Sequence, residues 1–350
     1  MKKLSIDWNQ AEAYPKPSGL KVFGTFVCGG GSTMGYKLAG FDHLGGVEID
    51  KRLEILYRNN HNPKHFYLED IREFNKRKDL PNELFNLDIL DGSPPCTTFS
   101  MCGKREATWG KEKVFKEGQV MQTLDDLVFV YCDTIARLRP KTAILENVPG
   151  LVAGRAKGYA IEVYDRLESA GYDVQMFMLN SATMGVPQSR ERLFFVARRR
   201  DLNYPQLRLQ FNTTPTYFKD IVDTGSNTHK PLWPSIKVRW PFVEYGDESL
   251  KFADAKYRKK NTYNAFFSTS IIYDDIVPGA LTSNGTTIYY DEVRNLNDLE
   301  YRRISGFPAD YNFCGLNIRY ICGMSVPPMM IAQIANQMRL QWFNCHLNDD

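Results

Sequence analysis

A cysteine directly after two prolines is the side chain in this sequence best placed to act as a nucleophile. It closes the segment Asp91-Gly92-Ser93-Pro94-Pro95-Cys96, which follows a short apolar run from Leu87 to Asp91. Because prolines restrict the backbone, we expect Cys96 to project from the carboxyl end of a buried strand, where ligands bind in open α/β sheets. A thiolate there can attack an electrophilic carbon if its surroundings lower the thiol pKa. A lone cysteine is usually a small core side chain, but the Pro-Pro-Cys context favours chemistry.

An acid and two cations accompany other predicted strands. Glu146-Asn147-Val148-Pro149 follows the strand-like run Thr142 to Leu145, and Gln188-Ser189-Arg190-Glu191-Arg192 precedes the run Leu193 to Ala197. If these strands share one sheet edge, a carboxyl group and two guanidinium groups join Cys96 in one crevice. For either arginine alone, a surface ion pair is an equally good interpretation. Taken together, the three segments predict one reactive site.

A glycine-rich turn indicates where a nucleotide-like ligand would bind. Phe26-Val27-Cys28-Gly29-Gly30-Gly31 follows a strand-like run, Val22 to Val27, and opens a helix. Glycines there let the backbone approach a ligand. Glu48, near the end of a second run from Leu44 to Ile49, can accept hydrogen bonds from two ribose hydroxyls, and Ile49 would offer an apolar face to adenine. Glycines with a purely structural role are the alternative. The absence of GxxxxGK[ST] and of a strict GxGxxG disfavours a phosphate site.

From Lys21 to about Arg198, short apolar runs alternate with amphipathic segments, and these elements would position the residues above. Helical spacing alternates with the strand-like runs, and Val174 to Leu179 is a further strand. The expected helices cover Met34–Ala39, Arg52–Asn59, Leu124–Leu138 and Tyr159–Ala170. Alternation of this kind predicts βαβ units and a mostly parallel sheet, which is an α/β fold.

The pattern changes after Arg200. Stretches rich in Pro, Thr, Asn and Trp show no sustained period as far as Thr287, and helical spacing returns at Asp298–Gly306 and Pro328–Leu340. We therefore predict an N-terminal extension (1–20), a catalytic and cofactor-binding domain (21–200), a smaller irregular domain (201–287) and a C-terminal segment that returns to the large domain (288–350).

Composition places the chain among ordinary globular proteins. It has 350 residues and a formal net charge of only +3, a weak hint of a polyanionic partner. The basic run from Lys256 to Lys260 is either a phosphate contact or a solvated face. No long apolar run or signal peptide is apparent, so we expect a cytoplasmic protein without membrane contact. The 7 cysteines show no metal-binding spacing, which predicts reduced thiols and no metal site.

From about Phe23 to Met338 the chain resembles the DNA (cytosine-5) methyltransferases. The resemblance rests on motif blocks in the family's order, of which Pro-Pro-Cys, Glu-Asn-Val and Gln-x-Arg-x-Arg together are highly specific. The blocks are Phe26–Gly31, Glu48, Asp70-Ile71, Ser93–Cys96, Glu146–Val148, Gln188–Arg192, Glu300 with Gly306-Phe307-Pro308, and Gly323 with Val326-Pro327-Pro328. It implies a Rossmann-like domain dependent on S-adenosylmethionine and a smaller target-recognition domain.

The resemblance also implies roles for the reactive residues. Cys96 would attack carbon 6 of a cytosine, so that carbon 5 becomes nucleophilic and accepts the methyl group. Glu146 would hold or protonate ring N3, and Asn147 would position that acid and the loop. Arg192 would reach the base O2, and Arg190 would support the site or a phosphate. A base would then remove the carbon-5 proton, and elimination would release Cys96. The cytosine must leave the duplex stack for this chemistry.

Binding residues follow from the same resemblance. Asp70 would accept a hydrogen bond from the adenine amino group. The whole cofactor pocket would comprise Phe26, Gly30, Gly31, Glu48, Ile49, Asp70, Pro94, Met324 and Ser325. A loop at Thr97–Gly118 would close over the base, with Ser100, Lys104 and Arg105 contacting DNA. Residues 201–287 would read the major groove, although no single side chain is assigned to a base.

The sequence departs from the family pattern at three places. Cys28 stands where the family usually has Gly, and Gly24-Thr25 replaces an Asp before Phe26. Met324 stands where Asn usually follows Gly323, near the methionine part of the cofactor. Met324 removes a polar partner and adds flexible bulk, so it is either a neutral change or a sign of altered donor handling, including use of a modified S-adenosylmethionine.

Two other function classes remain open. An RNA cytosine methyltransferase acting on transfer RNA would use the same Pro-Pro-Cys and Glu-Asn-Val segments. A non-catalytic DNA-binding relative is disfavoured because Cys96, Glu146 and Arg192 are all present. The favoured interpretation is a monomeric, prokaryotic or phage-encoded enzyme of a restriction-modification system, acting on double-stranded DNA.

Overall fold

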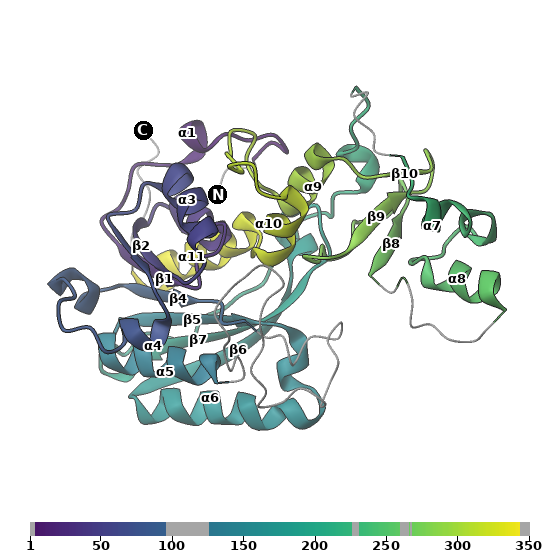
Figure 1. The fold of residues 1–350 in the computed structure, drawn as a ribbon. Helices are drawn as coiled ribbons and strands as arrows, with labels where there is room; N and C mark the ends of the chain where they lie inside the picture. Colours follow the sequence, from purple (N-terminus) through teal and green to yellow (C-terminus); the bar gives the residue numbers. More distant parts are fainter. Residues whose placement is uncertain (1–3, 96–125, 226–230, 260–265, 267, 344–350) are drawn as a thin grey trace.

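A seven-stranded sheet forms the centre of the computed structural model (Figure 1). The structure describes residues 4–95, 126–225, 231–259, 266 and 268–343. The strands are β1 (Lys21–Thr25), β2 (Asp42–Glu48), β3 (His65–Leu68), β4 (Ile89–Gly92), β5 (Thr142–Asn147), β6 (Tyr172–Asn180) and β7 (Glu191–Arg199), in the order β3-β2-β1-β4-β5-β7-β6. β7 runs antiparallel to its neighbours β5 and β6, and the other pairings are parallel. The prediction of an α/β fold with a mostly parallel sheet is confirmed.

Helices cover both faces of this sheet. α4 (Ile71–Phe74), α5 (Leu127–Leu138) and α6 (Lys157–Ser169) lie on one face, where their apolar side chains pack with Phe23, Leu90 and Leu145. On the other face, α2 (Gly31–Leu38) and α11 (Pro328–Trp342) pack with Val22, Ile89 and Ile144. α3 (Lys51–His61) packs beside α2. Burial of two faces explains why the strands are nearly continuous apolar runs.

A second, three-stranded sheet lies to one side of the first (Figure 1). β8 (Thr269–Ile272) pairs in parallel with β9 (Thr286–Tyr289), and β9 pairs antiparallel with β10 (Arg294–Asn295). The short helices α7 (Pro234–Lys237) and α8 (Lys251–Arg258) flank it. The sequence did not indicate these strands, because each has only two to four residues. The predicted domain boundary at 287–288 falls inside β9. The other predicted domain limits stay predictions.

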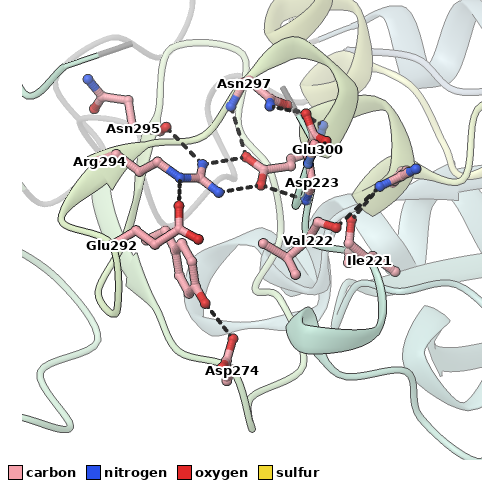
Figure 2. A network of polar contacts seen from close by, with 12 residues as sticks. Ile221, Val222, Asp223, Asp274, Glu292, Arg294, Asn295, Asn297 and Glu300 are labelled. Atoms are coloured by element: carbon pink, nitrogen blue, oxygen red, sulfur yellow. Dashed lines mark hydrogen bonds and ion pairs between the residues drawn. The ribbon is translucent and has the colours of Figure 1, made fainter. Parts of the chain in front are cut away.

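Two helices connect the small sheet with the large one. α9 (Asp298–Ser305) and α10 (Ile318–Met324) lie between the sheets, and the chain then returns through α11 (Figure 1). α9 begins in a capping box, in which Asn297 and Glu300 each accept from the other's backbone N–H. A buried polar network follows from it: Arg294 pairs with Glu300 at 2.8 Å, and Glu300 also accepts from the Asp223 backbone (Figure 2).

The N-terminal segment packs against the turn after α9. The Trp8 indole donates to the Gly306 carbonyl at 3.0 Å, and Asp7 forms an ion pair with Arg303 at 2.8 Å. A short helix, α1 (Gln10–Ala13), follows. Single 3₁₀ turns complete the described structure at Asn82–Phe85, Pro149–Val152, Gly154–Ala156, Ser181–Met184, Arg200–Leu202, Phe218–Asp220 and Trp240–Phe242. No helix in the described ranges has the length and apolar character needed to cross a bilayer.

Candidate active site

The ends of two neighbouring strands bring the Pro-Pro and Glu-Asn segments together. β4 pairs in parallel with β5, with Asp91 opposite Ile144. β4 leads into Ser93-Pro94-Pro95, and β5 ends at Glu146 and Asn147. Asn147 is buried, and its amide donates to the Pro94 carbonyl at 3.5 Å while its Oδ1 accepts from the Val148 backbone. The β4–β5 pairing therefore places the two segments at one edge of the sheet, where Asn147 contacts both.

Glu146 faces a guanidinium group from the neighbouring strand. Arg192 lies near the start of β7, and its Nε is 2.8 Å from Glu146 Oε1. The two side chains are only 14% and 10% exposed, so water screens their attraction poorly. The pair places a fixed positive charge beside the Glu146 carboxyl group.

Arg190 connects the start of β7 to distant segments. Its guanidinium donates to the Leu281 carbonyl at 2.8 Å and to the Gly323 carbonyl at 3.0 Å. Burial, with the nearby Arg192 charge, lowers the pKa of Arg190 to about 9. Gln188 is also fully buried and donates to the Ile304 carbonyl. This geometry suits support of the site better than contact with a phosphate.

The glycine-rich turn has a conformation and packing that few residues tolerate. Cys28 and Gly30 both have positive φ, 46° and 75°. A Cβ at Gly30 would lie 2.0 Å from His61 Nε2, and one at Gly31 would lie 2.0 Å from the Val326 carbonyl oxygen. Cys28 thus adopts a left-handed backbone conformation that usually favours Gly. Gly30 and Gly31 are required because His61 and the Val326 carbonyl lie where a side chain would be.

Two side chains fix the same carbonyl of the turn. The Tyr311 hydroxyl donates to the Gly29 oxygen at 2.5 Å, and His61 Nε2 lies 3.3 Å from it. Burial lowers the pKa of His61 to about 3, so the ring is neutral at ordinary pH. A neutral ring with its proton on Nε2 donates to Gly29, and the turn is held from α3 and from the segment before α10.

Glu48 closes β2 beside this turn. Its Oε2 accepts from the Cys28 backbone at 2.9 Å, and its Oε1 accepts from the Ile49 and Asp50 backbones at 2.9 and 3.1 Å. Burial raises the pKa of Glu48, and the three backbone donors oppose that rise. One lone pair of Oε2 remains for a ligand hydroxyl. The carboxylate is thus held in place by the backbone and has limited further acceptor capacity.

The other predicted pocket residues flank the turn. Phe26 and Ile49 are half-buried, and Phe26 has a φ of 56°. Asp70 caps α4 by accepting from the Arg72 backbone at 2.7 Å and also pairs with the Arg72 guanidinium. The Arg72 backbone and guanidinium thus fix the orientation of the partly exposed Asp70 carboxylate before any ligand binds.

The turn after α10 completes the surroundings of the glycine-rich turn. Ser325 is buried, and its Oγ would be 3.1 Å from a Cβ at Gly29. Met324 is 41% exposed, and Gly323 packs so closely on Thr282 that a Cβ would lie 2.5 Å from its carbonyl carbon. Segments from both ends of the chain therefore meet around one turn.

Four predicted site residues, Cys96, Ser100, Lys104 and Arg105, lie outside the described residues, as does the rest of the Thr97–Gly118 loop. Part of the basic run is described. Lys256 pairs with Glu244 at 2.9 Å and Arg258 pairs with Asp254 at 2.9 Å, and both side chains stay partly exposed. Over the described ranges, no cluster of three His, Cys, Asp or Glu side chains has an arrangement for a metal ion.

Sequence reasoning gave no role to several residues at this edge. His61 and Tyr311 carry no local signal, because they reach the turn from distant parts of the chain. Asp91 did have a local sequence signal, because it is a charged residue at the end of the apolar run that forms β4. In the structure it is buried, and it accepts a hydrogen bond from Tyr36.

Comparisons with known proteins find DNA methyltransferases that match most of the chain. A family model described as "C-5 cytosine-specific DNA methylase" matches residues 20–340. Type II methyltransferase M.NgoPII of Neisseria gonorrhoeae is 25% identical over 341 residues, covering 90% of this chain and 94% of its own. Type II methyltransferase M.Bsp6I of a Bacillus species is 31% identical over 304 residues, covering 83% and 89%.

Solved structures share the fold at lower identity. A protein encoded within an Escherichia coli prophage has a TM-score of 0.65 at 19% identity, covering 93% of this chain and 100% of that one. DNMT2 of Spodoptera frugiperda has a TM-score of 0.62 at 18% identity, covering 91% and 99%.

Proposed function

Since the chain belongs to the C-5 cytosine-specific DNA methylase family, we propose that it methylates carbon 5 of cytosine within a specific duplex DNA sequence, through a covalent bond between Cys96 and carbon 6. That it is a DNA cytosine methyltransferase follows from the family and from its type II relatives. The observation that best supports the proposed mechanism is the Glu146–Arg192 pair, which is largely buried at the strand end beside the Pro94 segment.

The proposed mechanism accounts for each proton that moves and each bond that forms or breaks. As the Cys96 sulfur bonds to carbon 6, electron density moves into the ring, and Glu146 gives its proton to N3 so that no anion accumulates. The Glu146 carboxylate that results lies against Arg192, which stabilises it. After transfer, a base takes the carbon-5 proton, the carbon–sulfur bond breaks, and N3 returns its proton to Glu146.

Donor binding falls to the residues around the glycine-rich turn. The turn that contains Gly30 and Gly31, the remaining lone pair of Glu48 Oε2 and the fixed carboxylate of Asp70 suit an adenosyl group with ribose hydroxyls and an exocyclic amine. When bound, S-adenosylmethionine supplies an electrophilic methyl group. Pro94 and Ser325 would line the same pocket.

Met324 supports a second possibility for the donor. Its exposed side chain follows Gly323, whose carbonyl is fixed by Arg190, so its position in the turn is set by buried contacts. An enzyme with altered donor handling would accept a modified S-adenosylmethionine. Mass spectrometry of nucleosides from modified DNA distinguishes the two: only 5-methylcytosine, with ordinary donor affinity, removes this possibility.

DNA recognition falls to residues 201–287 and to the loop that carries Ser100, Lys104 and Arg105. The cytosine flips out of the helix to reach the buried strand end. We propose that the protein belongs to a restriction-modification system, as the names of its type II relatives suggest. We also propose that it acts as a monomer. Transfer RNA is the alternative substrate, and initial rates on duplex DNA and on transfer RNA separate the two.

The direct experiment is bisulfite sequencing of DNA from methylation-deficient cells that express the protein. Conversion-resistant cytosines in one sequence context are expected with the wild type and none with Cys96→Ser. Resistant cytosines in the Cys96→Ser cells would exclude Cys96 as the nucleophile.

A further inference from the structure

A cavity of about 350 Å³ lies at the edge of the large sheet where β1, β4 and β5 begin. Lys21, Arg139, Lys141 and Arg199 line this cavity. The parallel strands start at this edge and end at the edge that carries Glu146, and Lys141 and Glu146 are about 16 Å apart along β5 at ~3.3 Å per residue. The cavity is therefore separate from the candidate active site, and its cations have no part in the proposed methyl transfer.

Backbone hydrogen bonds fix the positions from which these side chains start. The Asp88 N–H donates to the Lys21 carbonyl at 2.9 Å, the Lys141 N–H to the Leu87 carbonyl at 2.9 Å, and the Arg199 N–H to the Lys141 carbonyl at 3.0 Å. The strand order β1-β4-β5-β7 thus places cations from separate segments side by side (Figure 1). Their convergence is a product of the folded sheet, whereas the basic run after residue 255 only reflects neighbours along the chain.

Two carboxylates orient two of the cations. Asp88 is only 7% exposed, and it accepts from Lys141 Nζ at 2.7 Å and from the Lys21 backbone at 2.6 Å. Asp201 pairs with Arg199 at 2.8 Å, and the Arg199 side chain is 24% exposed. Cations that are held in place before binding lose less conformational freedom when a ligand arrives.

Two further cations leave this edge with a surplus of positive charge. Among the described residues no ion pair involves Lys21 or Arg139, although the Arg139 guanidinium donates to the Ala170 carbonyl at 3.5 Å. With Asp88 and Asp201 as the two carboxylates, the four cations give this edge two net positive charges, out of a formal net charge of +3 for the chain. Such a surplus in one cavity favours an anionic ligand.

We propose that this cavity binds a small ligand with two linked phosphate groups, either a nucleoside diphosphate or inorganic diphosphate. Neighbouring strands lie about 4.8 Å apart, so Lys21 and Lys141 start about 10 Å from each other, across β4. One phosphate group is too small to contact cations spread over this width, whereas two linked groups can contact both ammonium groups and the planar Arg199 guanidinium. Phe85 is 42% exposed in the same cavity wall and offers a ring on which a nucleotide base can stack.

Calorimetric titration of the full chain with inorganic pyrophosphate, at constant ionic strength, tests this site. Saturating S-adenosylmethionine keeps the donor pocket occupied. We expect saturable binding, and a dissociation constant about 10-fold higher in Lys21→Met and in Arg139→Gln, because each variant loses a hydrogen bond between charged groups. Lys219→Met is the matched control, because it removes one positive charge from an exposed pair outside the cavity and should bind pyrophosphate normally.

ADP distinguishes the two forms of the ligand. Tighter binding of ADP than of pyrophosphate, with the advantage lost in Phe85→Ala, would assign the cavity to a nucleotide. Equal binding of the two would assign it to inorganic diphosphate, and either result supports the proposal.

Three results would overturn the proposal. One is the absence of saturable binding at millimolar pyrophosphate. Another is equal weakening in Lys219→Met, which would show general charge attraction. The third is displacement of pyrophosphate by duplex DNA, which would assign these cations to the DNA backbone. Melting temperatures verify that each variant folds, and Arg139→Gln carries the test if Lys21→Met does not. DNA methylation should be unchanged in both variants, so failure of this site leaves the proposed function intact.

Discussion

The strand edge that carries Glu146 and the small sheet after residue 200 use buried charge in opposite ways. Near the small sheet, charges are paired for structure: Arg294 with Glu300 are 5% and 0% exposed, and Arg239 with Asp254 are 10% and 1% exposed. At the strand edge Glu146 pairs with Arg192, but among the described residues Asp91 has hydroxyl partners and no cation. Buried charge without a partner is costly, so its retention at the edge indicates a chemical use.

This difference predicts how substitutions should behave. Removing a charge at the strand edge should alter activity and leave stability unchanged or increased. Removing one beside the small sheet should lower stability first. Three substitutions of charged residues test that division, from the largest expected effect to the smallest, and a fourth tests a neutral contact at the glycine-rich turn.

Glu146→Gln should reduce methylation by a factor of about 10² to 10⁴, because the amide cannot give a proton to N3. Tritium incorporation into unmethylated phage DNA measures the effect. Glu162→Gln is the matched control, since Glu162 forms an exposed pair with Arg166 on α6 and should keep full activity. A Glu146→Gln rate within a few-fold of the wild type would remove Glu146 from the mechanism.

Arg294→Met should lower the free energy of unfolding by about 3–5 kcal/mol, because it leaves the Glu300 carboxylate buried without its cation. Urea unfolding followed by fluorescence measures it. Lys219→Met removes an exposed partner of Asp275 and should cost less than about 1 kcal/mol. Equal losses in the two variants would show that burial does not distinguish these pairs.

Asp91→Asn should stabilise the protein at high pH. The pKa of Asp91 is about 7 in the folded chain against 3.8 as a model value, so the unfolded state ionises first and stability falls as pH rises from about 4 to about 7. The variant lacks this loss, which is at most on the order of 4 kcal/mol above pH 7. Unfolding of both proteins at several pH values checks it. A variant less stable than the wild type at pH 8 would refute the sign.

Tyr311→Phe should weaken binding of S-adenosylmethionine by roughly 5-fold, because loss of about 1 kcal/mol of hydrogen bonding loosens the Gly29 carbonyl. Calorimetry measures donor affinity. Tyr14→Phe removes a hydroxyl that donates to Gln10, away from the turn, and should bind normally. An unchanged affinity in Tyr311→Phe would show that the turn keeps its shape without this contact.

Much of the large sheet could be predicted because its signals are local. The apolar run from Leu87 to Asp91 became β4, and the helical spacing of Leu124–Leu138 became α5 from Leu127 onward. β3 was not predicted, since its four residues are only partly buried at a sheet edge and show no alternation. The strands of the second sheet were not predicted because each has only two to four residues.

The site could be predicted only where its residues lie at strand ends. Glu146 and Arg192 were expected to meet because β5 and β7 share an edge, and they do. The partners of Asp91 could not be predicted, because Tyr36 reaches it from a helix 55 positions away in the sequence. Arg190 likewise reaches Leu281 and Gly323 only after the whole chain has folded.

The central claim is that Cys96 and Glu146 act on one flipped cytosine with the methyl donor present. Duplex DNA with 5-fluorocytosine at the target found by bisulfite sequencing tests it most directly, because fluorine at carbon 5 prevents release of the thiolate. We predict a covalent protein–DNA complex that needs S-adenosylmethionine, maps to the peptide containing Cys96, and is absent in Cys96→Ser. A complex attached to another residue, or methylation without any trapped complex, would contradict the mechanism.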